Sequence, residues 1–150
     1  MNNSWLFFIL FLFMSISPSN AQSLSSHQWK DRIIIIQSDE SSSQLLKSQI
    51  LELKKHEEGL EERRLVIYQV NSDQIKKRFD PKERWQKIDK SFKQIQNPSA
   101  GFEIILLGLD GGIKLRKTEL LTCDELFRTI DQMPMRRSEI RRKKDFDNFK

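Results

Sequence analysis

Cysteine is nearly absent from this chain of 150 residues, in which Cys123 is the only one. A single thiol excludes an intrachain disulfide and a redox-active pair of cysteines within one molecule. The neighbouring carboxylates of Asp124 and Glu125 oppose thiolate formation, so we expect a buried or idle thiol, with pairing between chains as the alternative. Histidine is scarce too. We expect His27 and His56 to be solvated side chains rather than bases or metal ligands, and we expect no cofactor.

Long apolar runs are missing as well, except for one near the N-terminus. Residues Trp5 to Ile16 are almost entirely apolar, but they are fewer than the roughly 20 apolar residues of a membrane span. Ser19-Asn20-Ala21 then places small residues ahead of Gln22, as at a secretory cleavage site. We therefore predict a signal peptide over residues 1–21 and export to the periplasm, the cell surface or the medium. No transmembrane segment is expected after cleavage.

Neither sign of charge dominates, since 26 Lys and Arg oppose 21 Asp and Glu. The net charge of +5 permits an anionic partner without requiring one. Basic side chains are densest near the C-terminus, at Arg136, Arg137, Arg141, Arg142, Lys143 and Lys144. Few aromatic residues lie among them, so we expect an unknown protein or an acidic glycan as the partner and no nucleic acid. We assign residues 22–140 to one domain and residues 141–150 to a basic tail that frays.

Two β-branched apolar runs, Arg32 to Gln37 and Leu65 to Val70, predict strands that are buried on both faces. Between them we expect a helix that begins at the hydroxyl caps Ser41 to Ser43 and reaches about Glu58, where Gly59 closes it. Two strands joined by a helix predict a parallel pair with a right-handed crossover.

The second half is expected to add two helices and a hairpin. In chain order these elements are a helix from Asp80-Pro81 to Ile95, strands over Phe102 to Leu107 and Ile113 to Arg116, and a helix that Thr122 caps and Pro134 stops. Asp110-Gly111-Gly112 is the turn of the hairpin. The order β-α-β-α-β-β-α predicts an α/β, thioredoxin-like fold in which helices cover a mixed sheet. Trp29, Met133 and Met135 are expected in its core.

Three strings carry a family resemblance: Trp29 to Arg32, Phe102 to Lys114 and Ile130 to Arg137. They resemble a family of small secreted bacterial proteins, domain of unknown function 4174. A similar domain occurs in vertebrate extracellular-matrix proteins of the sushi-repeat and coiled-coil-domain-containing groups. The resemblance covers about His27 to Arg141. It implies a thioredoxin-like fold and brings no established enzymatic activity.

A thioredoxin-type enzyme needs a thiolate at the N-terminus of the helix after the first strand, and a cis-proline opening the third strand. Here Ser38 to Gln44 contains no thiol, and Glu103 stands in place of the proline. We therefore expect an exported, non-catalytic module with a binding or structural role. The alternatives are a polyanion- or envelope-binding protein that uses the basic tail, a non-redox enzyme with an unrecognised site, and a one-cysteine peroxidase using Cys123.

Asp131, Arg136, Arg137 and Lys114 form the candidate anion-binding or structural group. A carboxylate at the end of a helix, followed by two guanidinium groups, can clamp a chain reversal through a bidentate ion pair. We favour this structural role over an anion-binding surface, because most such ion pairs are structural.

Overall fold

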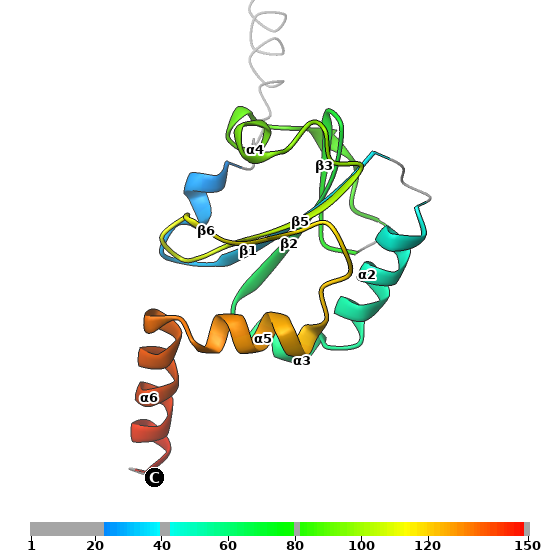
Figure 1. Cartoon of the computed structure of the whole chain (residues 1–150). Coiled ribbons are helices and arrows are strands. Elements are labelled where there is room, and N and C mark those ends of the chain that lie inside the picture. The colour runs from blue at the N-terminus through cyan, green and yellow to red at the C-terminus, as the bar shows by residue number, and fades with distance from the viewer. Residues whose placement is uncertain (1–22, 40–42, 80–81, 149–150) are drawn as a thin grey trace, which may run out of the picture.

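The computed structural model describes residues 23–39, 43–79 and 82–148. Their strands form a six-stranded sheet in the order β4-β3-β2-β1-β5-β6 (Figure 1). Its centre is built from the three predicted apolar strands: β1 (Arg32–Ser38), β2 (Leu65–Asn71) and β5 (Phe102–Leu107). β1 pairs in parallel with β2 and antiparallel with β5, which makes the sheet mixed as expected. The predicted signal peptide lies outside the described residues.

Helices cover both faces of the sheet, which explains why every residue of β1 and β5 is buried. One face carries α2 (Gln44–Lys54), α3 (Glu57–Glu62) and α5 (Cys123–Asp131), and the other carries α4 (Lys90–Ile95) and the 3-10 helix η2 (Leu24–His27) (Figure 1). Alternate side chains of β1 serve the two faces. Ile34 and Ile36 pack under α2 and α5, whereas Ile33 and Ile35 pack under α4.

The helix after β1 ends earlier than predicted, and Gly59 does not close it. α2 stops at Lys54, and Gly59 lies inside the separate helix α3. A Cβ atom on Gly59 would lie 2.6 Å from the ring of Phe127 on α5. Gly59 therefore allows α3 to approach α5 closely. The residue serves packing between helices rather than a left-handed cap.

The helix predicted from Asp80 to Ile95 was wrong over most of its length. Asp80 and Pro81 lie outside the described residues, and the chain between β2 and α4 instead forms the short strands β3 (Gln74–Lys77) and β4 (Gln86–Lys87). β3 pairs antiparallel with β2, and β4 with β3. Helix α4 begins only after Asp89, whose carboxylate accepts a hydrogen bond of 2.8 Å from the Ser91 backbone N–H. Pairing at the sheet edge outweighs the local helix signal of Asp80-Pro81, because β2, β3 and β4 satisfy one another's backbone hydrogen-bonding groups.

The C-terminal hairpin is confirmed. β6 (Ile113–Lys117) returns antiparallel to β5, and Gly111 in the turn has φ of 78°. That left-handed conformation suits glycine, which has no Cβ atom to clash. The predicted cap of the next helix is also present, because the Thr122 side chain accepts a hydrogen bond from the backbone N–H of Glu125.

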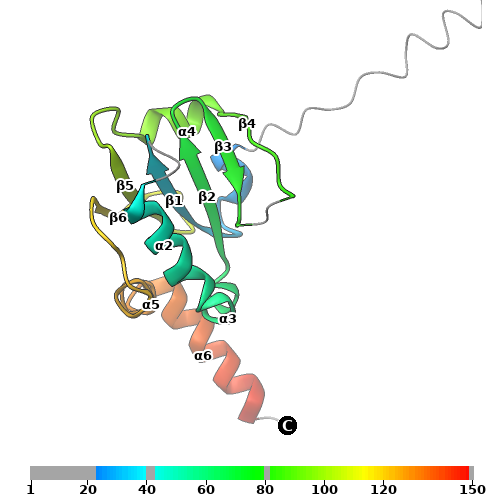
Figure 2. The same ribbon diagram turned by 90° about the vertical axis from the view of Figure 1, so that its right-hand side faces the viewer.

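Most of the predicted basic tail lies in a helix within the described residues. α6 runs from Pro134 to Asn148 and projects away from the body of the domain (Figures 1 and 2). Pro134 therefore opens a helix, in addition to standing beyond the end of α5. Proline fits the first helical turn because no intrahelical acceptor is needed for its missing N–H group. Within the described ranges, no helix is both long and apolar enough to cross a membrane.

Candidate functional site

The corner that carries the thiol in thioredoxin-type enzymes lies between the end of β1 and the start of α2. Its described residues are Ser38, Asp39 and Ser43. The Ser38 and Ser43 hydroxyls are 3.2 Å apart, and Ser43 caps α2 by accepting a hydrogen bond of 3.1 Å from the Leu46 N–H group. The chain's one cysteine is elsewhere, on α5. This corner, the redox corner of the fold, therefore offers hydroxyl and carboxyl groups but no sulfur nucleophile.

Glu103, at the position where a cis-proline would open β5, is buried and forms an ion pair. Its carboxylate accepts a hydrogen bond of 2.8 Å from Arg116, and the same guanidinium group donates to the carbonyl of Ile95 at 2.6 Å. None of the described peptide bonds is cis. The ion pair links β5 to β6 and α4. It lies at the place where a cis-proline would complete the redox site of a thioredoxin-type enzyme.

Cys123 is the first residue of α5 and is fully buried, as predicted. Burial, together with the negative charges of Glu52 and Asp124, raises the pKa of its thiol to about 12. The adjacent carboxylate of Asp124 was foreseen, whereas Glu52 arrives from α2 through the fold. One oxygen of Glu52 accepts a hydrogen bond of 3.0 Å from the backbone N–H of Cys123. At neutral pH the thiol is therefore protonated and out of reach of solvent.

The prediction that His27 is a solvated side chain was wrong. Its side chain is buried, and its two ring nitrogens join Asp31 to Tyr68 at 2.9 and 2.8 Å. The backbone N–H groups of Lys30 and Asp31 donate to the His27 carbonyl, and this turn after η2 brings the Asp31 carboxylate to the ring. Tyr68 itself is fully buried on β2, and burial raises its pKa to about 12. The chain of three side chains therefore fastens η2 to the sheet.

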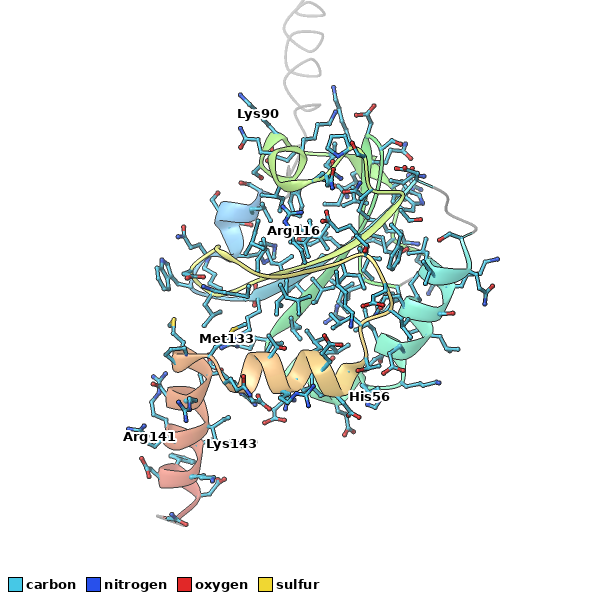
Figure 3. The ribbon with its side chains drawn as sticks, in the orientation of Figure 1. His56, Lys90, Arg116, Met133, Arg141 and Lys143 are labelled. Carbon is cyan, nitrogen blue, oxygen red and sulfur yellow. The ribbon has the colours of Figure 1, made fainter. Side chains whose placement is uncertain are left out.

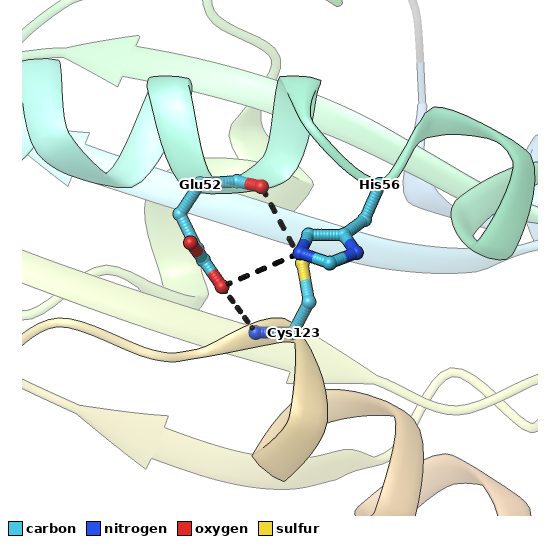
Figure 4. Close-up of side chains that lie close together, drawn as sticks. All are labelled: Glu52, His56 and Cys123. Atoms are coloured by element: carbon cyan, nitrogen blue, oxygen red, sulfur yellow. Dashed lines mark hydrogen bonds and ion pairs between the residues drawn. The ribbon is translucent and has the colours of Figure 1, made fainter.

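His56 is exposed, as predicted, but it does have potential ligands nearby. Glu52 from α2 and Cys123 from α5 gather with it, and the three ligand atoms all lie within 4.8 Å of one another (Figure 4). Spacing along the chain could not reveal the group, because Cys123 comes from a segment far away in sequence.

The predicted ion pair between Asp131 and Arg136 is present, and it belongs to a larger group of ion pairs. Asp131 accepts a hydrogen bond of 3.1 Å from Nε of Arg136, and Arg63 donates to both oxygens of the same carboxylate at 3.1 and 2.6 Å. Arg136 is only 5% exposed and also donates to the Glu62 carboxylate at 2.8 Å. We call this group of ion pairs, made by Asp131, Arg63, Arg136 and Glu62, the clamp. Arg137, by contrast, is exposed on α6 and takes no part in it.

Burial alone would raise the pKa of Asp131, but hydrogen bonds from Arg63 and Arg136 and their positive charges lower it overall. The same balance holds at Glu139 on α6. Burial would raise the pKa of Glu139, and hydrogen bonds and charge, first from Arg32, outweigh it. Arg32 is 1% exposed and donates to both oxygens of Glu139, at 3.3 and 3.1 Å. Ion pairs therefore bind the start of α6 to β1 and to the end of α3.

A pocket of about 270 Å³ opens where the three strings of the resemblance meet. Its walls come from the start of β1, the β5–β6 turn and the junction of α5 with α6: Arg32, Gly108, Leu109, Asp110, Lys114, Met133, Pro134 and Met135. Most of this lining is apolar. The Nε group of Arg32 is buried there without a hydrogen-bond partner among the described residues. The pocket lies at the Arg32 end of β1, whereas the redox corner lies at the Ser38 end.

Two residues expected in the core lie on the surface near this pocket. Trp29 is 59% exposed, and Met135 is 44% exposed. Trp29 has φ of 64° at the chain reversal before β1, and this reversal places His27 rather than Trp29 against Tyr68. Met133 does pack against the core below the sheet (Figure 3). The pocket is therefore bordered by exposed apolar side chains.

Lys114, the fourth member of the candidate group, lies on the wall of the pocket rather than in the clamp. Its Nζ donates to Asp110 at 2.7 Å. A Cβ atom on Gly108 would lie 2.5 Å from the Lys114 side chain, so Gly108 leaves room for the lysine to fold back over the turn. The predicted group is thus divided: Asp131 and Arg136 form the clamp, Lys114 lies on the pocket wall, and Arg137 belongs to neither site.

The fold is that of a thioredoxin-like domain in which the redox corner contains no cysteine. It is similar to the solved structure of reduced 2-Cys peroxiredoxin from Plasmodium vivax, with a TM-score of 0.51 and 15% sequence identity over 72% of this chain and 80% of that one. No curated protein matches the chain. The chain belongs to the family described as Domain of unknown function (DUF4174), whose model matches residues 23–139.

Proposed function

We propose that this chain is an exported thioredoxin-like module that binds a partner and catalyses no thiol redox reaction. The proposal rests on the difference between the two ends of β1. The end beside Ser38 has no thiol, whereas the end beside Arg32 has a pocket with mostly apolar walls and a few polar groups. Pockets of that composition are typical of binding sites.

The redox half of the proposal is tested by two assays on the purified protein. Insulin reduction with dithiothreitol should run at the rate of the blank, because no second thiol resolves a mixed disulfide. Peroxide consumption should be equal for the wild type and Cys123→Ser, since the thiol is buried and protonated. Turnover above the blank in the first assay, or cysteine-dependent turnover in the second, would contradict the proposal.

The binding half is tested by capture of partners from the envelope fraction of the organism. Met135→Glu places a charge beside the pocket, on a side chain that is already 44% exposed. Leu45→Glu is a matched control, because Leu45 is 43% exposed on α2, outside the pocket wall. A partner that uses the pocket is retained by the wild type and the control and is lost from Met135→Glu. Equal capture by all three proteins would remove the pocket from the proposal.

Polyanion binding through α6 is the second candidate function. The helix projects from the body, and Arg141 and Lys143 lie on its surface (Figure 3). The exposed basic residues there are Arg137, Arg141, Arg142, Lys143 and Lys144. Such a helix suits acidic glycans, whose binding weakens as salt rises because charges are screened.

Heparin chromatography distinguishes this candidate from general basicity. Replacing Arg141, Arg142, Lys143 and Lys144 by Gln keeps side chains that favour a helix and removes four positive charges. The matched control also introduces four Gln residues, in place of lysines that are exposed outside α6: Lys30, Lys47, Lys55 and Lys90. If α6 binds the polyanion, its variant elutes at lower salt than the control. Identical elution of the two variants would assign the retention to net charge alone.

Export is proposed from the apolar run Trp5 to Ile16 and the small residues before Gln22. N-terminal sequencing of the secreted protein should begin at or within a few residues of Gln22. A secreted chain that begins at Met1 would contradict cleavage.

A further inference from the structure

The corner between α2 and α3 meets the start of α5 at a group of three different metal-ligating side chains. Glu52 comes from the last turn of α2, His56 precedes α3, and Cys123 opens α5. The Nε2 atom of His56 lies 3.9 Å from Oε1 of Glu52, and all three ligand atoms lie within 4.8 Å of one another (Figure 4). Because the group draws on both segments, a cation bound there would join them.

The donor set is one imidazole nitrogen, one thiol sulfur and one carboxylate oxygen. Zinc accepts these three donor types, and a site with three protein ligands leaves a fourth position for water. In a tetrahedral zinc site neighbouring ligand atoms lie about 3.3 to 3.7 Å apart. The three atoms must therefore move closer together by up to about 1.5 Å, a movement within the reach of an exposed side chain such as His56.

The fold holds the inner ligands and leaves the outer one adjustable. Cys123 is fixed by the first turn of α5, and the Glu52 carboxylate is held by the Cys123 backbone N–H at 3.0 Å. The His56 side chain is 43% exposed, and its ring meets the Phe127 ring edge to face. Its side chain makes no capping hydrogen bond to α3. A cation from solvent thus meets the imidazole and the carboxylate first and the sulfur beneath them.

We propose that Glu52, His56 and Cys123 form a zinc site that fastens the α2–α3 corner to α5. On binding, the sulfur–hydrogen bond of Cys123 breaks, a sulfur–zinc bond forms, and one proton leaves to solvent. The imidazole binds in its neutral form and Glu52 as the carboxylate. A divalent cation balances the charges of both the thiolate and the carboxylate, whereas in the metal-free protein the thiol keeps its proton. The site is separate from the pocket near Arg32, so the zinc proposal and the proposed function can be tested independently.

The test begins with cobalt as a spectroscopic substitute for zinc. Co²⁺ titrated into the reduced, metal-free protein should produce a thiolate-to-cobalt charge-transfer band in the near ultraviolet. The band should saturate at one equivalent and disappear when Zn²⁺ is added. Zn²⁺ should also raise the melting temperature, since a ligand that binds only the folded state stabilises it. Absence of the band at saturating Co²⁺ would overturn the proposal.

Variants at the ligands show whether the three residues act together. His56→Ala and Glu52→Gln should each weaken Zn²⁺ binding by at least about tenfold, as expected when a metal site loses part of its donor set. Glu52→Gln retains an oxygen that can accept from the Cys123 N–H, so folding is preserved. Cys123→Ser should remove the band. Glu57→Gln, which changes an exposed carboxylate outside the group, is the control. Zinc affinity in His56→Ala equal to that of the control would reject the site.

Discussion

Asp131 and Arg136 are joined by a hydrogen bond of 3.1 Å across the turn that links α5 to α6. Arg63, which follows the last residue of α3, donates to both oxygens of the same carboxylate. Its guanidinium group also lies over the Phe127 ring, 4.1 Å from the ring centre. Charge-assisted hydrogen bonds therefore hold the start of α6 against α3 and α5.

Asp131→Asn should destabilise the domain. The amide is neutral and leaves Arg136 and Arg63 with a weaker partner, and Arg136 is only 5% exposed. We expect a loss of about 1 to 3 kcal/mol in the free energy of unfolding, measured by urea denaturation. Arg137→Gln is the control, because this arginine is exposed, and it should melt like the wild type. If Asp131→Asn also melts like the wild type, the clamp contributes nothing to stability.

Acid should weaken the same clamp. The pKa values of Asp131 and Glu139 are lowered in the folded protein, so their ion pairs add stability that is fully present above their unfolded pKa values of about 4. This stability is lost as the pH falls through the folded values. The free energy of unfolding should therefore drop below about pH 4, and it should drop less in Asp131→Asn. Parallel pH dependences of the two proteins would exclude Asp131 as a contributor.

Tyr68→Phe should isolate the hydroxyl group that holds His27. Phenylalanine keeps the ring and its edge contact with Phe92, whereas Nε2 of His27 loses its partner at 2.8 Å. Leaving a buried polar group unpaired costs about 1 to 3 kcal/mol, and thermal unfolding should show this loss. An unchanged melting temperature would show that the contact is energetically neutral.

Cys123 should react slowly with a disulfide reagent in the native, metal-free protein. Burial is the main reason for its raised pKa, ahead of the charge of Glu52. The native rate should be at least about tenfold below that of the unfolded chain, and Glu52→Gln should remain slow because the thiol is still buried. A variant that reacts like a free thiol would show that charge rather than burial protects the sulfur.

The centre of the sheet could be predicted from the amino-acid sequence. The apolar runs of β1, β2 and β5 are too continuous for a half-exposed element, so both their type and their burial could be predicted. Local chemistry also located the Thr122 cap and the Gly111 turn, because a cap and a left-handed turn depend on a few adjacent residues. The absence of a thiol after β1 followed directly from the residues present.

Tertiary structure decided the sheet edge and the projecting helix. The strands β3 and β4 are short and polar, and they form because β2 offers backbone groups to pair with. The helix signal at Asp80-Pro81 gave no information about that edge. α6 lacks a sustained apolar stripe, and its start is held by ion pairs of Arg136 and Glu139 with groups from β1, α3 and α5. The partners from β1 and α3 lie far away in the chain, so no local pattern could predict those contacts.

The candidate sites show the same division. Asp131 and Arg136 are close in sequence, and their pairing could be predicted, whereas Arg63 joins them only through the fold. His27 is buried because the chain reversal before β1 turns it onto Tyr68. Glu52, His56 and Cys123 have no common pattern along the sequence. Packing of α2 and α5 on the same face of the sheet brings them together, and such long-range packing leaves no local signal in the sequence.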